Sequence, residues 1–328
     1  MNNRIRLVVV ALLATTVFIS CQKETPEEEG FTSIDNISME NYPKVDGATA
    51  TWALNRMIAC KLLGVEYTWS RAIGGGERGI VPVYEQFENW DESHAFSNFL
   101  NERVKNSQTH GAFTNLIDGN ADIIVVSSHP SPSEKAHANE KGVTLIETPI
   151  ALDAFVFIVN EANPVKSLTT EQIRKIYTKQ ITNWSQVGGT DSEMKVFTRP
   201  RNSGSEETLR ALVMGGLEPA DFPESDQVQG MGAVFPEIQT SVNGICYTFN
   251  NYKDVLAQIP EGIAAKIAID GIFPDKTTID NRTYPFITEV YAVIRSDLDR
   301  NSMAYKLYEW LRTGSAKMVL GECGFSAY

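Results

Sequence analysis

Hydrophobic and polar positions follow two different periods along this 328-residue chain. Apolar residues recur at helical spacing from Leu54 to Leu62, and this stripe stops before Gly64. Short unbroken apolar runs between polar turns are instead typical of buried strands. Strands are expected at 123–126, 143–146, 154–159, 194–198, 244–249, 265–269 and 288–294, and helices at 51–63, 109–118, 169–177, 208–214 and 305–311. Strands that alternate with helices predict an α/β fold.

The first residues have a different pattern. Arg4 and Arg6 precede an apolar stretch over 7–19, which ends at Ser20 and Cys21. A stretch this short is typical of a signal peptide and too short for a membrane span. A small residue followed by cysteine resembles a lipoprotein signal, with cleavage before Cys21 and lipidation of its thiol; a plain secretory signal is the alternative. We expect 1–20 to be this signal and 21–39, which is acidic, to be a flexible tether.

The charge balance limits the possible partners. The whole chain has a net charge of −12, and no acidic residue lies in the first twenty positions. Without Arg4 and Arg6, 27 basic residues face 41 acidic ones, so the mature chain carries −14. This charge argues against nucleic acid and against an anionic bilayer as partners. An anionic ligand would have to be held by local dipoles and one or two cations.

Cysteine and histidine give no metal or cofactor signal. Beyond Cys21, Cys60, Cys246 and Cys323 are far apart and lack CxxC spacing, so neither a zinc site nor a disulfide framework is indicated. The four histidines are also scattered, at positions 94, 110, 129 and 137. We therefore expect no metal and no cofactor.

The most informative segment is 199–207, which lies between a predicted strand and a predicted helix. Its turn places Arg199, Ser203, Gly204 and Ser205 at a helix start. Free backbone N–H groups and the positive end of the helix dipole favour anions there, and a guanidinium group matches a tetrahedral oxyanion. A serine-capped helix start without a ligand is the alternative interpretation.

Three more loops rich in Gly, Ser and Thr follow strand-like runs. They occupy 46–51, 107–110 and 127–131, beside the 202–206 turn. Ligands of α/β proteins bind at the carboxyl ends of strands, so we expect the four loops to converge on one small anion.

These segments resemble the phosphate-binding proteins of bacterial Pst-type ABC transporters. The matching motifs include Asn-Pro-Val at 163–165, Asn-Trp at 183–184, Val-Gly-Gly at 187–189 and the Arg-x-x-x-Ser-Gly-Ser of 199–205. The motifs occur in the family's order and cover nearly all of 42–328. The full set of matching segments is 46–50, 116–119, 122–124, 149–154, 159–160, 163–165, 168–169, 181–189, 199–205, 244–247, 284–285 and 323–325.

The resemblance implies a two-lobed periplasmic binding protein of type II, with the ligand in a cleft between two α/β lobes. The two crossing strands would lie near 152–159 and 284–294. Lobe one would then be 40–152 plus 286–328, and lobe two would be 153–285. The resemblance also implies a monomer. Carried over by motif, the ligand contacts are Thr49, Ala50, Thr109, Arg199, Ser203, Gly204 and Ser205.

One departure concerns selectivity. The family's best-studied members carry an aspartate after the strand that here ends at Ser127 and Ser128, and this carboxylate accepts the proton of hydrogen phosphate. Here Ser128 is expected to contact the ligand in its place, followed by His129. Asp46 is interpreted as a turn residue, with the acceptor role of the missing aspartate as the alternative. His129 is a second candidate for that role.

The resemblance implies a lipoprotein of the cell envelope, anchored on the periplasmic face or outer surface, that delivers phosphate or a related oxyanion to an ABC permease. The alternative is a surface lipoprotein of the same fold that acts as sensor, scavenger or adhesion scaffold, or binds another oxyanion such as sulfate.

No catalytic residue is expected, because Ser203 lacks the G-x-S-x-G context. The glycine-rich 74–79 segment precedes no helix, so a dinucleotide site is not expected; Arg78 beside it is a candidate to overhang the cleft.

Overall fold

The computed structural model describes residues 30–70, 77–257 and 259–328. The predicted signal peptide, Cys21, most of the tether and Gly74–Gly76 lie outside the described residues. The chain divides into two compact units, Met1–Gly30 and Phe31–Tyr328. The second unit carries all the helices and strands given below.

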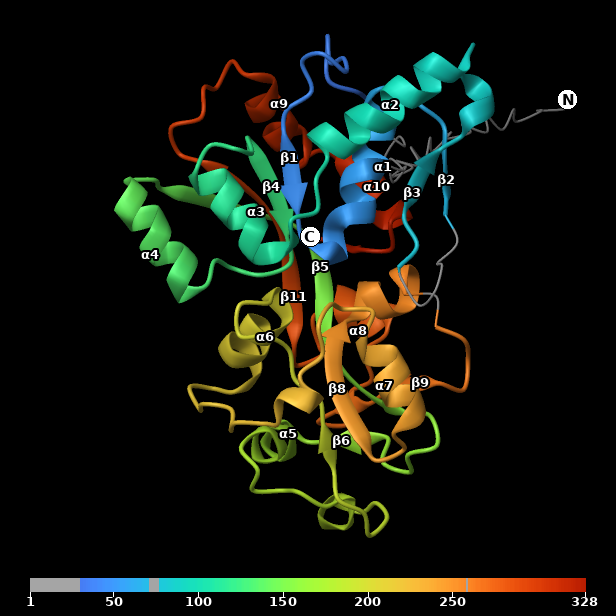
Figure 1. The fold of residues 1–328 in the computed structure, drawn as a ribbon, viewed down its shortest axis with the longest axis vertical. Coiled ribbons are helices and arrows are strands. Elements are labelled where there is room, and N and C mark those ends of the chain that lie inside the picture. Colours follow the sequence, from blue (N-terminus) through green and yellow to red (C-terminus); the bar gives the residue numbers. More distant parts are fainter. Residues whose placement is uncertain (1–29, 71–76, 258) are drawn as a thin grey trace, which may run out of the picture. The chain divides into compact units, whose positions relative to one another are not determined.

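A mixed sheet runs through the second unit (Figure 1). Its order is β1 (Val45–Gly47), β4 (Ile123–Val126), β11 (Ile287–Arg295), β5 (Leu145–Asn160), β8 (Gly244–Phe249) and β7 (Lys195–Val196). The β1–β4 and β7–β8 pairs are parallel, and the others are antiparallel. Two more strands, β9 (Ala264–Lys266) and β12 (Ser326–Ala327), pair with β5. Two small sheets pair β2 (Tyr67–Trp69) with β3 (Ile80–Pro82), and β6 (Ser167–Leu168) with β10 (Ala268–Ile269).

Strand β5 joins two runs that the sequence predicted as separate strands. Its first part pairs with β11 and its last part, from Phe155, pairs with β8. The intervening Pro149 hid this continuity, because proline has no N–H to donate to a ladder. The register with β11 shifts beside Pro149, between Val290 and Tyr291, so the strand continues past the proline through an irregularity in its pairing.

The helices confirm the predicted α/β class and add segments that the pattern missed. The predicted ones are α1 (Trp52–Leu62), α3 (Gln108–Ile117), α5 (Thr170–Tyr177) and α9 (Met303–Trp310). The fifth predicted helix begins earlier than expected, as α6 (Gly204–Thr208), and continues as a π-helical turn, η4 (Leu209–Val213). The unpredicted helices are α2 (Trp90–Arg103), α4 (Pro132–Lys141), α7 (Val234–Thr240), α8 (Lys276–Asp280) and α10 (Gly314–Glu322).

The core forms where the predicted stripes meet the sheet. Leu54, Met57 and Ile58 of α1 are buried against it, as the helical spacing predicted. The aromatic side chains of Phe113 and Trp184 are also almost fully enclosed. Burial of such side chains stabilises the fold by roughly 1.5–3 kcal/mol each.

The predicted tether is too long. The Trp310 indole donates to the carbonyl of Thr32 at 2.8 Å, and the Ser33 hydroxyl donates to that of Leu62 at 2.9 Å. Ile34 and Ile37 pack against the core. The apolar residues of this segment are thus held on the folded unit, which begins at Phe31 and not at residue 40.

Candidate functional site

The four predicted loops meet around one cavity of about 410 Å³. Residues 48–50 come from the loop after β1, and 107–111 from the start of α3. Ser127 and Ser128 follow β4, and 199–205 lead into α6. The predicted convergence is confirmed, and all eight predicted contact residues line this cavity: Thr49, Ala50, Thr109, Ser128, Arg199, Ser203, Gly204 and Ser205.

Three helical segments begin at this cavity. The short 3₁₀ turn η1 (Thr49–Thr51) leads directly into α1, and α3 and α6 start at Gln108 and Gly204. The first N–H groups of a helix have no acceptor within the helix. They carry the positive end of the helix dipole. The cavity wall is therefore rich in backbone donors, which suits an anion.

Arg199 is the cation of the cavity. It is 8% exposed, and its Nε has no hydrogen-bond partner within the described residues. Within these residues Arg199 also forms no ion pair, whereas Arg210 and Arg295, which are more exposed, each pair with a carboxylate. Burial lowers the pKa of Arg199 from its ordinary value, although arginine stays charged in proteins. A buried charge without a partner is costly, so this geometry favours an anion beside Arg199.

Serine hydroxyls surround the same space. The Oγ atoms of Ser127, Ser128 and Ser205 are buried and have no partner within the described part of the chain. Buried polar atoms are nearly always paired in folded proteins. Three unpaired hydroxyls on one cavity are therefore typical of a site prepared for a ligand that accepts hydrogen bonds.

A buried network holds the α6 turn in place. The Tyr247 hydroxyl accepts from the N–H of Arg199 at 3.0 Å and donates to Glu206. The other Glu206 oxygen accepts from Arg210 Nε at 2.8 Å. Glu206 is 4% exposed, yet it belongs to this network and does not line the cavity. The network thus fixes the backbone of Arg199 and engages the Glu206 carboxylate, which favours the charged guanidinium but forms no ion pair with it.

Gly204 allows α3 and α6 to approach each other. A Cβ at this position would lie 2.4 Å from Thr109 Oγ1 and 3.3 Å from Ser128 Oγ. The first distance is shorter than any real contact, so only glycine fits between these two loops.

Asp46 acts as the turn residue that the sequence suggested. Its Oδ1 accepts from the N–H groups of Gly47 and Ser107, and its Oδ2 accepts from Asn115 Nδ2. Both oxygens are occupied and Asp46 does not line the cavity. The alternative, that Asp46 accepts a proton from the ligand, is therefore wrong for this arrangement.

His110 was not selected from the sequence, but it lines the cavity. Its Nδ1 lies 2.9 Å from Oε1 of Glu134, which is 3% exposed. Glu134 belongs to α4, whose capping box it completes by accepting from the Ser131 N–H. The pair joins residues 24 positions apart through the packing of α3 on α4, which no local motif reveals.

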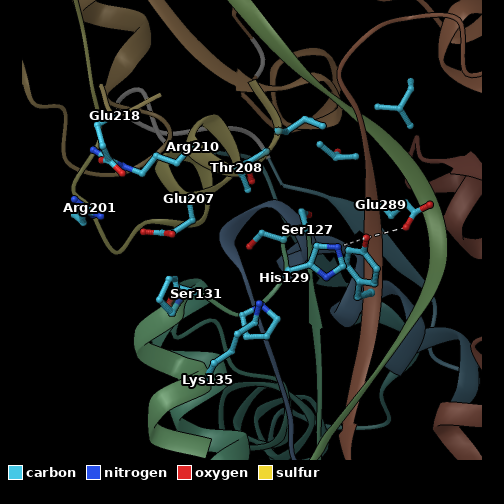
Figure 2. A pocket seen from close by; sticks show the side chains of 18 of the residues that line it. Ser127, His129, Ser131, Lys135, Arg201, Glu207, Thr208, Arg210, Glu218 and Glu289 are labelled. Carbon is cyan, nitrogen blue, oxygen red and sulfur yellow. Dashed lines mark hydrogen bonds and ion pairs between the residues drawn. The ribbon is translucent and has the colours of Figure 1, made fainter. Parts of the chain in front are cut away.

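A second cavity, of about 790 Å³, lies beside the first (Figure 2). Ser127 and Ser128 line both cavities. His129 and Arg201 line only the second. His129 lies 2.6 Å from Glu147 Oε2 through Nδ1 and 2.9 Å from the Tyr291 hydroxyl through Nε2. His129 therefore does not replace the missing aspartate in the anion cavity.

Arg78 was a candidate to overhang the cleft, and the structure places it elsewhere. Arg78 donates to the carbonyl of Val255 at 2.6 Å and lies over the Trp69 ring, and it does not line the anion cavity.

Cys60, Cys246 and Cys323 are buried free thiols. Over 30–70, 77–257 and 259–328, no cluster of His, Cys, Asp and Glu has the arrangement of a metal site. No helix in these ranges is long and apolar enough to cross a bilayer.

Comparison with known proteins agrees with this geometry. A family model described as a PBP superfamily domain matches residues 100–312, more than half of the chain. The phosphate-binding protein PstS of Borreliella burgdorferi is 24% identical over 207 residues. This alignment covers 62% of the chain and 71% of the relative.

Two solved structures have a similar fold. One, from Clostridium perfringens, is described as a phosphate ABC transporter substrate-binding protein with bound phosphate. Its TM-score is 0.60 at 19% sequence identity, and the alignment covers 87% of this chain and 98% of that one. The other, an ABC-type phosphate transport receptor from Vibrio cholerae, has a TM-score of 0.58 and 21% identity, and covers 87% and 99%. The predicted fold class and the resemblance to phosphate-binding proteins are confirmed.

Proposed function

The chain belongs to the PBP superfamily, and we propose that it is an extracytoplasmic solute-binding lipoprotein that binds inorganic phosphate and delivers it to an ABC permease. The ligand lies between two lobes, 40–152 with 286–328 and 153–285, in the cavity of about 410 Å³. The lobe boundaries carry over from the resemblance. The proposal assigns the protein a binding role and no reaction.

The observation that carries the proposal is the unpaired Arg199. A guanidinium that is 8% exposed, lacks an ion pair within the described residues and faces helix starts and free hydroxyls needs an anionic partner. A tetrahedral oxyanion satisfies donors that converge from several directions. Among the proteins to which the chain is similar, several are phosphate-binding proteins by name, which favours phosphate among the oxyanions.

The contacts proposed for phosphate are the eight predicted residues. Thr49 and Ala50 offer groups at the start of η1, and Thr109 does so at the start of α3. Ser203, Gly204 and Ser205 surround the start of α6, where Arg199 adds the charge. Ser128 supplies a hydroxyl from the loop after β4.

Isothermal titration of the folded unit with phosphate, sulfate, arsenate and molybdate tests the ligand. We expect one phosphate per chain. A signal for phosphate that is absent or much weaker than for another oxyanion contradicts the phosphate assignment, and no signal for any of them contradicts an anion-binding function.

The anchor is tested separately. We expect Cys21 to be the lipidated first residue of the mature protein, because the short apolar run ends at Ser20 and Cys21. Cys21→Ser should abolish labelling with a fatty acid analogue and release folded protein or leave an uncleaved precursor. A wild-type N-terminus at any residue other than 21 contradicts this part of the proposal.

Delivery to a permease requires its own experiment. Purified permease in proteoliposomes should hydrolyse ATP faster when the phosphate-loaded protein is added. Phosphate binding without any such stimulation would favour a sensor or scavenger of the same fold.

A further inference from the structure

The anion cavity is lined by only two titratable side chains within the described residues, Arg199 and His110, and by no carboxylate. We propose that His110 makes the site selective for an oxyanion that carries a proton, so that phosphate is preferred to sulfate while the imidazole is neutral. This inference rests on the proposed function and adds a selectivity residue to the same site.

The position of the imidazole proton follows from Glu134. Its Oε2 accepts from the Ser131 N–H at 2.7 Å, and its Oε1 lies 2.9 Å from His110 Nδ1. Glu134 stands in the first turn of α4, where the helix dipole favours the carboxylate. A carboxylate only accepts hydrogen bonds, so Nδ1 of His110 carries the proton.

The other ring nitrogen is the one that selects. In the neutral ring Nε2 has a lone pair and no hydrogen, and the His110 side chain lines the cavity while 45% exposed, so this lone pair is open to a ligand. Phosphate keeps at least one P–O–H group near neutral pH and can donate to this lone pair. Sulfate has no proton to donate, so an oxygen and a nitrogen acceptor would face each other. An unpaired polar contact of this kind corresponds to roughly a 5- to 150-fold loss in affinity.

The remaining donors in the cavity do not discriminate. The hydroxyls of Ser127, Ser128 and Ser205 rotate and donate to any acceptor oxygen. Arg199 and the helix N–H groups donate to both anions equally. Selectivity for a protonated ligand therefore depends on an acceptor. The amides of Gln108, Asn202 and Gln229 also line the cavity but carry both a donor and an acceptor, whereas the neutral His110 ring, with its Nδ1 proton held by Glu134, offers only an acceptor at Nε2.

The selectivity should depend on pH. When the imidazole gains a second proton, Nε2 becomes a donor and accommodates either anion. On the elements packed against α3, the charged and titratable groups are Glu134, Lys135, His137, Glu140 and Lys141 of α4, Glu206 and Glu207 of α6, Asp46 of β1, and Glu289, Tyr291 and Arg295 of β11. Arg199 lies in the cavity, and Asp118 pairs with His137 at the far end of α3.

The test is a competition titration of phosphate by sulfate at about pH 8 and about pH 5.5, on either side of the range in which histidine titrates. In the wild type the preference for phosphate should fall by about tenfold or more at the lower pH. His110→Asn replaces the imidazole by an amide that does not titrate. Its preference should be weak, and the change that it shows between the two pH values reflects the ionisation of phosphate itself and is subtracted from that of the wild type.

Glu134→Gln tests the positioning role of the carboxylate. The amide oxygen must stay with the Ser131 N–H, so the amide NH₂ faces His110 Nδ1 and moves the imidazole proton to Nε2. At about pH 8 this variant should bind phosphate less selectively than the wild type, by about tenfold or more. A purely structural role of Glu134 would lower stability and leave the selectivity ratio unchanged.

Two other histidines with carboxylate partners serve as controls. His129→Asn and His137→Asn remove rings paired with Glu147 and Asp118, and neither ring lines the anion cavity. Both variants should keep the wild-type pH dependence. A pH-independent ratio in the wild type, or a pH dependence as large in His110→Asn as in the wild type, overturns the inference. Absence of phosphate binding by the wild type at both pH values overturns the proposed function instead.

Discussion

At the residue scale, the anion cavity combines one buried cation, Arg199, with serine hydroxyls that have no hydrogen-bond partner among the described residues. Within the described residues Arg199 forms no ion pair, because the buried carboxylate of the turn, Glu206, bonds to Tyr247 and Arg210 instead. The hydroxyls of Ser128 and Ser205 are equally unpaired. A buried donor without a hydrogen-bond partner destabilises the protein, and a ligand that accepts from these groups offsets that cost.

Gly204 gives a prediction at this scale. Gly204→Ala places a methyl group 2.4 Å from Thr109 Oγ1 and 3.1 Å from Thr109 Cβ, so the Thr109 side chain must turn away or α3 and α6 must move apart. We expect phosphate affinity to fall by about tenfold or more, since overpacking typically costs 1–3 kcal/mol. Titration calorimetry measures the change.

Gly321 provides the matched control. It also lies within a helix, α10, and a Cβ there meets nothing within 4 Å. Gly321→Ala should leave binding unchanged and raise stability by about 0.5–1 kcal/mol. Wild-type affinity in Gly204→Ala would show that the close approach of α3 and α6 is not needed for binding.

The sequence predicted which residues line this site better than it predicted the hydrogen bonds between distant segments around it. Arg199, Ser203 and Ser205 were recognisable because they lie together in one turn between a strand and a helix. His110 and Glu134 were not, because only the packing of α3 on α4 brings them to 2.9 Å. Asp46 and His129 were considered as acceptors, but their hydrogen bonds to other parts of the chain could not be foreseen from local pattern.

At the element scale, β5 is the strand that connects the two parts of the sheet. It pairs with β11 as far as Ala154 and with β8 from Phe155. Asp153 lies at this change of partner and is 2% exposed. Its Oδ1 accepts from the N–H groups of Ala154 and Asn251, while its Oδ2 has no partner among the described residues.

Asp153 predicts a pH dependence of stability. Burial raises the pKa of Asp153 to about 7 in the folded protein, whereas an unfolded aspartate titrates near 3.9. Between these values the folded state binds more protons, so its contribution to stability is greatest at about pH 4 and falls as pH rises to about 7. The slope should approach about 1.4 kcal/mol per pH unit.

Asp153→Asn removes this titration and keeps an oxygen for the two N–H groups. The difference in unfolding free energy between variant and wild type should therefore shift in favour of the variant from about pH 5 to about pH 8. Urea unfolding at several pH values measures it. Parallel pH profiles of the two proteins would contradict the assignment.

Local pattern predicted most strands and fewer helices. The strand β4 was located to the residue, since four consecutive buried aliphatic residues mark it. Helices α2 and α4 were missed because few of their residues are buried, so their polar surfaces give no apolar stripe. Strand continuity was wrong twice: β5 was split at Pro149, and the single strand predicted at 265–269 is divided into β9 and β10, which pair with different strands.

At the scale of the whole molecule, the charge opposes the ligand. The whole chain carries −12, or −14 after the proposed cleavage before Cys21, and phosphate is an anion, so the long-range interaction is repulsive. Salt screens such repulsion over a Debye length of about 10 Å at 0.1 M. The association rate of phosphate should therefore rise with sodium chloride concentration. Stopped-flow measurements at low and high salt test this, and a rate that falls with salt would indicate local steering that overcomes the net charge.

The fold at this scale was predictable mainly through the resemblance. Periodicity indicated an α/β class, but the order of the strands and the convergence of four loops depend on pairings between distant segments. The boundary at residue 39 was wrong, because the acidic composition of the tether hid the apolar contacts of Ile34 and Ile37 with the core.

The central claim is that Arg199 holds an oxyanion, and the pair Arg199→Ala and Arg201→Ala tests it most directly. The two arginines are two residues apart, but Arg199 lines the anion cavity and is buried, whereas Arg201 is exposed and lines the second cavity (Figure 2). Removing a charged partner of a buried anion costs roughly 2–5 kcal/mol. Calorimetry with phosphate should therefore show a loss of about 30-fold to several thousandfold in Arg199→Ala and little change in Arg201→Ala. Equal losses in the two variants, or an unchanged affinity in Arg199→Ala, would contradict the account.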